Sequence, residues 1–289
     1  MDFSNKIAVG HDGSEESFLA VRWAAGVAAA ADQELAVVHG WIWPQLTKQL
    51  GPVEGIPDSG LRSAADDLLR EGVEAAREVA PEVRVGTALI TGEGRTALGH
   101  VSRTADLVVV GHRGLGGFLG MLLGSVSLDL ITHAGCPVAI IRTADAGTGD
   151  VVVGVDGSEA GLAAVGTAVR LAGTWRAPLR VVHVRRVINS RTAASDDEAR
   201  DVLDQGVARA RELGLTEVTG ELVDHRSVSQ GLLDAAGRAR IIVVGIEGAG
   251  RRGFGSNAHA VMHHTTGNAV VTRYVARDEA DEVEVVATD

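Results

Sequence analysis

The chain has 289 residues, of which 45% are hydrophobic and only 3% aromatic, so it can form one large domain or two ordinary ones around an aliphatic core. A formal net charge of −11 without any visible cluster of Lys or Arg argues against duplex nucleic acid as a partner. The single cysteine, Cys136, excludes an intramolecular disulfide, and with no signal peptide at the start and no segment apolar enough to span a bilayer we expect a soluble, cytoplasmic protein without a membrane partner.

Three segments of the sequence occur twice, in the same order. The matched pairs are 7–15 with 151–159, 35–39 with 179–183, and 106–111 with 240–245. A repeat of this length indicates two copies of one domain rather than a solenoid. We therefore expect a first domain over residues 1–145, a second over 150–276, and an acidic, solvated tail over 277–289.

Within the first copy, short runs of apolar residues alternate with helical patterns. In chain order, the expected elements are a strand at 7–10, a helix capped by Ser14, a strand at 35–39, a long loop at 40–60, a helix at 61–79, a strand near 83–90, a short helix near 95–103, a strand at 107–110, a helix from 125, and a strand at 138–141. This alternation predicts a five-stranded parallel sheet with helices on both faces. Right-handed crossovers make such a sheet doubly wound, with ligands at the carboxyl ends of its strands.

A glycine-rich segment follows the fourth strand of the first copy. Gly111 and Gly114 are separated by two residues, and Gly124-Ser125 follow after nine more. Residues without a Cβ let a phosphate approach the main chain, and the free N–H groups of a helix that begins at Ser125 attract anions. Arg113 adds positive charge, and Asp12, after the first strand, can accept from a ribose hydroxyl or an adenine amino group. The segment therefore predicts a nucleotide site.

These motifs resemble the universal stress protein family. The resemblance rests on Gly-x2-Gly-x9-Gly-Ser after a Val-Val-Val-Gly strand, on Val-Gly-x-Asp-Gly-Ser near the start, and on the segment from His133 to Val138 before the last strand. It covers both halves and implies the adenine nucleotide alpha hydrolase-like fold, with the halves packed as a pseudo-dimer through their last strands and a possible pairing of two chains.

The resemblance also implies a ligand and its contacts. ATP would bind the first half, with Mg²⁺ on its phosphates, and the protein would act as a stress-response binding or sensing module for an unknown protein partner. The implied site residues are Asp12, Gly40, Val110, Gly111, Arg113, Gly114, Gly124, Ser125, Val126 and Ser127. A hydrophobic side chain is more usual in the family at the position of Gly40. We name no catalytic residue, and we weigh a slow ATPase and a nucleotide-free interaction module as alternatives.

The second copy departs from the pattern. Glu247 stands at the position of Arg113, and we expect Ala258-His259 to replace Gly124-Ser125, followed by a shortened segment before the last strand. These changes predict a degenerate nucleotide loop in this half.

Several features also have ordinary structural explanations. The loop glycines of the first half fit simple turns, Asp12 fits a helix cap, and Arg113 fits a solvated loop. His259 and His263 have the spacing of metal ligands on a helix, but no carboxylate or thiol partner is evident, so we expect no metal site. The fingerprint-like stretch 92–97 follows the third strand rather than the first, and we interpret it as a turn and a helix start.

Overall fold

The computed structural model describes residues 2–41, 59–115, 122–145, 147–188, 191–192, 194–247 and 256–274. The elements of the first half are β1 (Lys6–Gly10), α1 (Glu15–Ala31), β2 (Glu34–Trp41), α3 (Ser59–Val79), β3 (Val85–Thr91), α4 (Gly94–Val101), β4 (Leu107–Gly111), α5 (Ser125–His133) and β5 (Val138–Ile141). Each helix and strand expected here is present, with its boundaries within two residues of the expected ones. Most of the expected loop at 40–60 and the whole acidic tail lie outside the described residues.

The second half repeats this order. Its elements are β6 (Val151–Val155), α6 (Glu159–Trp175), β7 (Leu179–Ile188), β8 (Arg191–Thr192), α7 (Asp196–Glu212), β9 (Val218–His225), α8 (Val228–Ala235), β10 (Ile241–Glu247), α9 (Ser256–His264) and β11 (Ala269–Tyr274). The two-residue strand β8, which pairs antiparallel with the extended end of β7, has no counterpart among the described elements of the first half.

The first helix of each half begins and ends in the same way. The Ser14 hydroxyl accepts from the backbone N–H of Ser17, and that of Ser158 accepts from the backbone N–H of Gly161. Each helix ends at a residue in the left-handed conformation, Asp32 or Arg176, whose N–H bonds back to the last turn. The matching caps set where the first helix of each copy begins and ends, because they satisfy main-chain groups that the helix itself leaves free.

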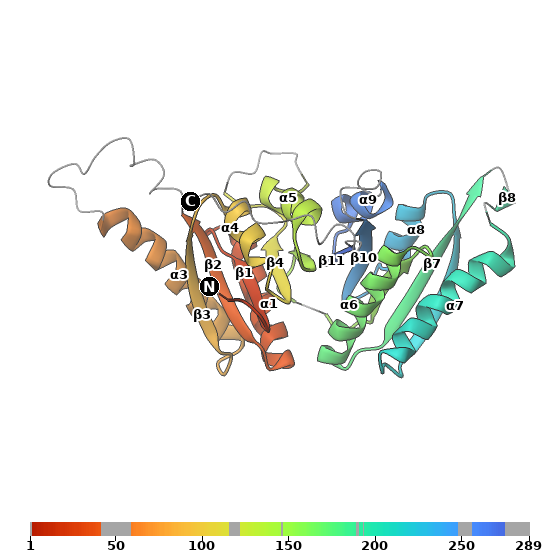
Figure 1. Cartoon of the computed structure of the whole chain (residues 1–289), viewed down its shortest axis with the longest axis horizontal. Coiled ribbons are helices and arrows are strands. Elements are labelled where there is room, and N and C mark those ends of the chain that lie inside the picture. The colour runs from red at the N-terminus through yellow and green to blue at the C-terminus, as the bar shows by residue number, and fades with distance from the viewer. Residues whose placement is uncertain are drawn as a thin grey trace, which may run out of the picture.

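The strands form two parallel sheets that meet edge to edge (Figure 1). In the first half the order is β3-β2-β1-β4-β5, and in the second β9-β7-β6-β10-β11, which is the same order. The last strands of the two halves, β5 and β11, pair antiparallel, so one continuous sheet runs through the described part of the chain. The expected pairing of the halves through their last strands is confirmed.

Helices cover both faces of this sheet. One face packs against α1, α3, α6 and α7, and the other against α4, α5, α8 and α9. The buried side chains are almost entirely Val, Ile, Leu and Ala, as the composition predicts. Trp23 of α1 and Trp175 of α6 meet edge to face across the two halves, with ring centroids 5.9 Å apart.

Polar contacts hold the seam between the halves. Asn268, which precedes β11 and is 3% exposed, accepts from the backbone N–H groups of Arg142 and Thr143 and donates to the carbonyl of Thr143. The guanidinium of Arg142 donates to the carbonyl of Met262 at the end of α9, at 2.6 Å. Such bonds pair main-chain groups of one half with side chains of the other.

Candidate functional site

A cavity of about 420 Å³ opens at the carboxyl ends of β1, β2 and β4 in the first half. All ten residues predicted from the sequence line it: Asp12, Gly40, Val110, Gly111, Arg113, Gly114, Gly124, Ser125, Val126 and Ser127. This edge is the one at which doubly wound sheets bind ligands, and the volume lies in the range of small-molecule sites. The structure thus brings the whole predicted set together.

Asp12 is fixed by bonds to both of its carboxylate oxygens. Its Oδ1 accepts from the N–H of Ser14 at 3.0 Å and from the Ser14 hydroxyl at 2.5 Å, while its Oδ2 accepts from the N–H of Leu115 at 3.1 Å. Burial alone would raise the pKa of this carboxyl, but the hydrogen bonds from Ser14 and Leu115 outweigh burial and lower the pKa below its ordinary value. Asp12 is therefore an ionised acceptor at neutral pH.

Two of the loop glycines are required by packing within the protein. A Cβ on Gly111 would lie 2.7 Å from the carbonyl oxygen of Glu16, in the first turn of α1, and a Cβ on Gly114 would strike Oδ2 of Asp12. In the second half, a Cβ on Gly245 would strike the carbonyl of Ala160 in the same way. Glycine at this position therefore lets β4 pass the start of α1 and β10 pass the start of α6. The fold itself requires it, whether or not a phosphate binds.

Gly124 differs from these two. It precedes α5 with φ −74° and ψ 160°, a conformation open to any residue, and a Cβ there would come no closer than 3.4 Å to another atom. No side chain caps α5 through Gly124, so the first turn leaves N–H groups at the cavity wall that can receive an anion. Nothing in the packing of the described residues requires glycine here.

Two polar side chains of the site already have partners. The Ser127 hydroxyl donates to the carbonyl of Gly111 at 2.9 Å, so its one proton is used within the protein. The Arg113 guanidinium lies 3.7 Å from the carboxylate of Glu16 and donates through Nε to the ring of His112 at 3.2 Å. Arg113 is 39% exposed and can turn toward a ligand, since such an ion pair is weak in water.

Gly40 and Gly94 bring two backbones together at the floor of the cavity. A Cβ on Gly40 would lie 2.8 Å from both N and Cα of Gly94, so glycine here lets the start of α4 reach the end of β2. Gly92, with φ +133°, makes the preceding turn, which confirms the interpretation of 92–97 as a turn and a helix start. His39, next to Gly40, bonds through Nδ1 to the carbonyl of His11 at 2.8 Å.

The sequence interpretation missed a buried polar pair in the same cavity. His11 and Ser17 both line it, and their Nδ1 and Oγ atoms lie 2.9 Å apart. Nε2 of His11 is buried without a hydrogen-bond partner, and burial lowers the pKa of this imidazole to about 4. At the matched positions the second copy has Val155 and Gly161, and this difference between the copies was a signal for the pair.

The expected pairing of Ala258-His259 with Gly124-Ser125 is wrong. Helix α9 begins at Ser256 and has nine residues, as α5 has from Ser125. The residue that matches Ser125 is therefore Ser256, and Ala258 is a buried residue within the helix, at the position of Ser127.

The position of the length change explains the error. Nine residues separate Gly114 from Gly124 in the first copy, but only six separate Gly248 from Gly255 in the second. The second copy is thus shorter before the helix and not after it, because α5 and α9 lie equally far from the strands that follow them. The glycine loop of the second copy lies largely outside the described residues, and so does the side chain of Glu247.

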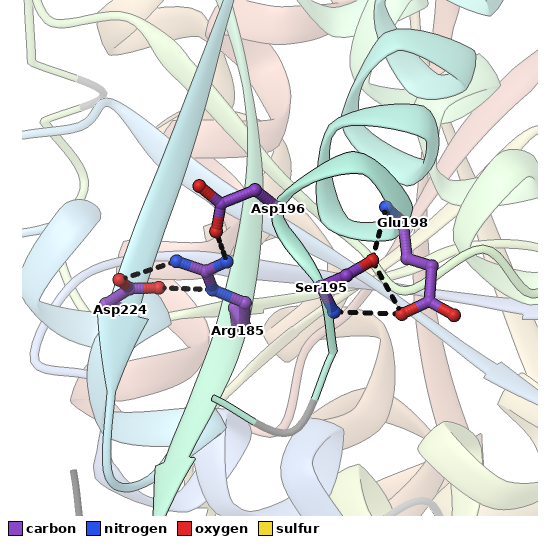
Figure 2. Close-up of polar contacts among 5 residues, drawn as sticks. All are labelled: Arg185, Ser195, Asp196, Glu198 and Asp224. Carbon is purple, nitrogen blue, oxygen red and sulfur yellow. Dashed lines mark hydrogen bonds and ion pairs between the residues drawn. The ribbon is translucent and has the colours of Figure 1, made fainter. Parts of the chain in front are cut away.

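Two side chains near the end of β7, Val184 and Arg185, distinguish the second half from the first. Val184 takes the place of Gly40 and is buried against α8, where a Cβ on Gly231 would come within 2.8 Å of it. Arg185 follows, 8% exposed, and binds Asp224 through two hydrogen bonds of 2.7 and 2.8 Å and Asp196 through a third. Figure 2 shows this cluster, which ties β7, β9 and the start of α7 together.

The histidines of α9 and the single cysteine were further candidates for chemistry, as metal ligands and as a nucleophile. His259 and His263 approach each other with their Nε2 atoms 3.0 Å apart, and within the described ranges no group of three or more His, Cys, Asp or Glu is arranged to hold a metal. Burial raises the pKa of the Cys136 thiol to about 12, which disfavours the thiolate a nucleophile needs. None of the described helices is both long and apolar enough to cross a membrane.

Two copies of a parallel α/β sheet, one of them with a cavity at the carboxyl ends of its strands, define a tandem doubly wound protein. The model of the Universal stress protein family matches residues 4–142 and 148–273, and the chain belongs to this family. Universal stress protein Rv2005c of Mycobacterium tuberculosis (strain ATCC 25618 / H37Rv) is 30% identical over 288 residues, which cover 92% of this chain and 96% of the relative.

Two further proteins are similar over most of their length. Universal stress protein Rv2623 of the same strain is 30% identical over 260 residues, covering 84% of this chain and 87% of the relative. The crystal structure of a universal stress protein from Archaeoglobus fulgidus DSM 4304 matches with a TM-score of 0.66 at 20% identity, covering 93% of this chain and 98% of its own. At that identity the structural likeness shows the fold.

Proposed function

We propose that the first half of the chain binds ATP, with Mg²⁺ on the phosphates, and that the protein is a nucleotide-dependent binding or sensing module of a stress response. The observation that carries the proposal is the convergence of all ten predicted residues on one cavity of about 420 Å³. A nucleotide needs an acceptor for its sugar or base and a source of positive potential for its phosphates, and Asp12 and the first turn of α5 supply these at the same cavity.

Each predicted residue has a proposed role. Asp12 binds the ribose or the adenine, with Gly40, Val110 and Gly111 lining the nucleoside end. The phosphate end is formed by Arg113, Gly114, Gly124, Ser125, Val126 and Ser127. Of these, Gly124 supports a phosphate most directly, because its glycine has no other explanation in the described packing.

Hydrolysis is the less favoured function. A general base must reach the attacking water with a free acceptor. His112, beside the loop, accepts from Arg113 through Nε2, and its Nδ1 is buried. Asp129, on α5, faces His133 at 3.4 Å. We therefore propose that the protein binds the nucleotide and does not hydrolyse it. We also propose that it acts in the cytoplasm, through a protein partner.

Mass spectrometry of the gently purified full chain, followed by calorimetry with Mg²⁺ and ATP, tests the proposal. Bound ATP, or saturable heat on titration, supports a binding module. Bound ADP, with ATP consumed on incubation, would instead favour the ATPase. A protein that carries no nucleotide and gives no heat at millimolar ATP would refute the proposal and favour a nucleotide-free interaction protein.

A further inference from the structure

Hydrogen bonds of the His11 and Ser17 side chains hold the turn between β1 and α1, where Asp12 lies. The Ser17 hydroxyl donates to the carbonyl of Ser14 at 2.8 Å, which uses its only proton. Its oxygen then accepts from Nδ1–H of His11 at 2.9 Å and from the N–H of Asp12 at 3.4 Å. This assignment fills both lone pairs of the oxygen and places the imidazole proton on Nδ1. The Ser17 hydroxyl thus binds His11, Asp12 and Ser14, which lie in the turn between β1 and α1.

This arrangement costs the folded protein stability. His11 is 2% exposed, and its second nitrogen, Nε2, is buried without a partner. A buried polar atom that finds no hydrogen bond destabilises the folded state. The ring also packs edge to face on Phe18, with centroids 4.6 Å apart, a contact that an apolar side chain could make without that cost.

The second half shows that the fold does not need the pair. Val155 and Gly161 stand in its place, yet Asp156 still accepts from the N–H and the hydroxyl of Ser158, as Asp12 does from Ser14. His183 likewise still bonds to the carbonyl of Val155 at 2.9 Å. The same strand, turn and helix therefore form with an apolar residue and a glycine at these two positions.

We propose that His11 and Ser17 are positioning residues of the nucleotide site, holding the main chain at Asp12 so that its carboxylate is presented to the ribose or adenine of the ligand. This inference rests on the proposed function of the first half. The polar pair occurs in the half whose Asp12 lines the cavity. In that half the Ser17 hydroxyl accepts from the main-chain N–H of Asp12, in addition to the hydrogen bonds from Ser14 and Leu115 that hold its carboxylate.

Two variants of the full chain separate positioning from stability. His11→Val with Ser17→Ala imitates the apolar pair of the second half, and Ala avoids the cost of glycine within a helix. His11→Asn keeps a donor near the position of Nδ1, so the bond to Ser17 survives, although the variant buries another polar atom. Calorimetry with Mg²⁺ and ATP gives the affinity of each protein, and urea unfolding gives its stability.

The two variants should have opposite effects on stability and on ATP affinity. The His11→Val, Ser17→Ala variant should have a free energy of unfolding at least as large as that of the parent. It should bind ATP about tenfold more weakly, which is the loss expected for about one hydrogen bond. The Asn variant should be less stable but keep the parent affinity within about twofold. Parent affinity in the Val/Ala variant, or affinities that follow stability in both variants, would overturn the inference. Failure of the parent itself to bind ATP would refute the proposed function and this inference with it.

Discussion

Gly114 and Asp12 are packed so closely that a Cβ on residue 114 would strike Oδ2 of the carboxylate. The same oxygen accepts from the N–H of Leu115 at 3.1 Å, so the glycine loop is tied to the end of β1 at this point. The carboxylate cannot simply move aside, because Ser14 holds its other oxygen through two hydrogen bonds.

Substitution of Gly114 by Ala should therefore displace Asp12 and weaken ATP binding by tenfold or more, with a stability cost of about 1–3 kcal/mol from overpacking. Calorimetry and urea unfolding measure the two effects. Gly99→Ala is the matched control, since this glycine lies within α4 with open space around its Cβ position, and the change should stabilise the helix slightly. Unaltered ATP affinity in Gly114→Ala would show that Asp12 does not contact the ligand.

Gly124→Ala should have the opposite balance of effects. The backbone conformation suits alanine and the added methyl group has room, so the free energy of unfolding should stay within about 0.5 kcal/mol of the parent value. ATP affinity should fall more than tenfold, because the methyl group would occupy the path of a phosphate toward the first turn of α5. If the variant bound ATP as tightly as the parent, Gly124 would be a turn residue and nothing more.

His11 should make the protein less stable in acid. Its pKa is about 4 in the folded protein because burial disfavours the imidazolium, against 6.5 for the ordinary residue. Above pH 6.5 the ring is neutral in both states; as the pH falls, the unfolded chain is protonated first and the free energy of unfolding declines until about pH 4. The loss amounts to about 3 kcal/mol at most.

Urea unfolding of the parent and of His11→Val between about pH 7.5 and about pH 4.5 isolates this effect, because the upper limit lies roughly one unit above the ordinary pKa of 6.5 and the lower limit roughly half a unit above the folded pKa of about 4. The pKa values of His112 and His263 are also lowered by burial, but both groups remain in the variant and cancel in the comparison. The stability advantage of the variant should grow as the pH falls. A difference that does not change with pH would mean that His11 titrates normally in the folded protein.

The seam between the halves should depend on Asn268. Replacing it with Ala leaves the N–H groups of Arg142 and Thr143 without their acceptor, at a cost of about 2–4 kcal/mol in the free energy of unfolding. Asn257→Ala, on the exposed side of α9, is the control and should change stability by less than about 0.5 kcal/mol. Equal stability of the two variants would show that the seam is held by apolar packing alone.

The strands were predictable because they follow from local patterns, and the set of cavity residues was predictable because the resemblance to a known family implied it. Runs such as Val108–Val110 have few alternatives to a buried strand, and parallel strands bring their carboxyl ends to one edge. The roles of individual glycines were not predictable, since the need for Gly111 depends on the carbonyl of Glu16, which meets β4 only in the folded chain.

The register of the second copy and the pair of His11 with Ser17 were missed for different reasons. The Gly255-Ser256 dipeptide is visible in the sequence. The numbering difference that aligns Gly245 with Gly111 was, however, also applied beyond the loop, which is shorter in the second copy. The bond between His11 and Ser17 crosses a turn and follows neither a helical nor a strand period, so only a comparison with Val155 and Gly161 could have revealed it.

We propose that one ATP binds per chain, in the first half. There, Asp12, Arg113 and the cavity favour a nucleotide, whereas the second half carries Glu247 in place of Arg113. The measurement is the stoichiometry of ATP on the full chain by calorimetry at protein concentrations well above the dissociation constant, for the parent and for Gly124→Ala. We expect one site per chain in the parent and its loss in the variant. Two equivalent sites per chain, or one site that survives Gly124→Ala unchanged, would contradict the claim.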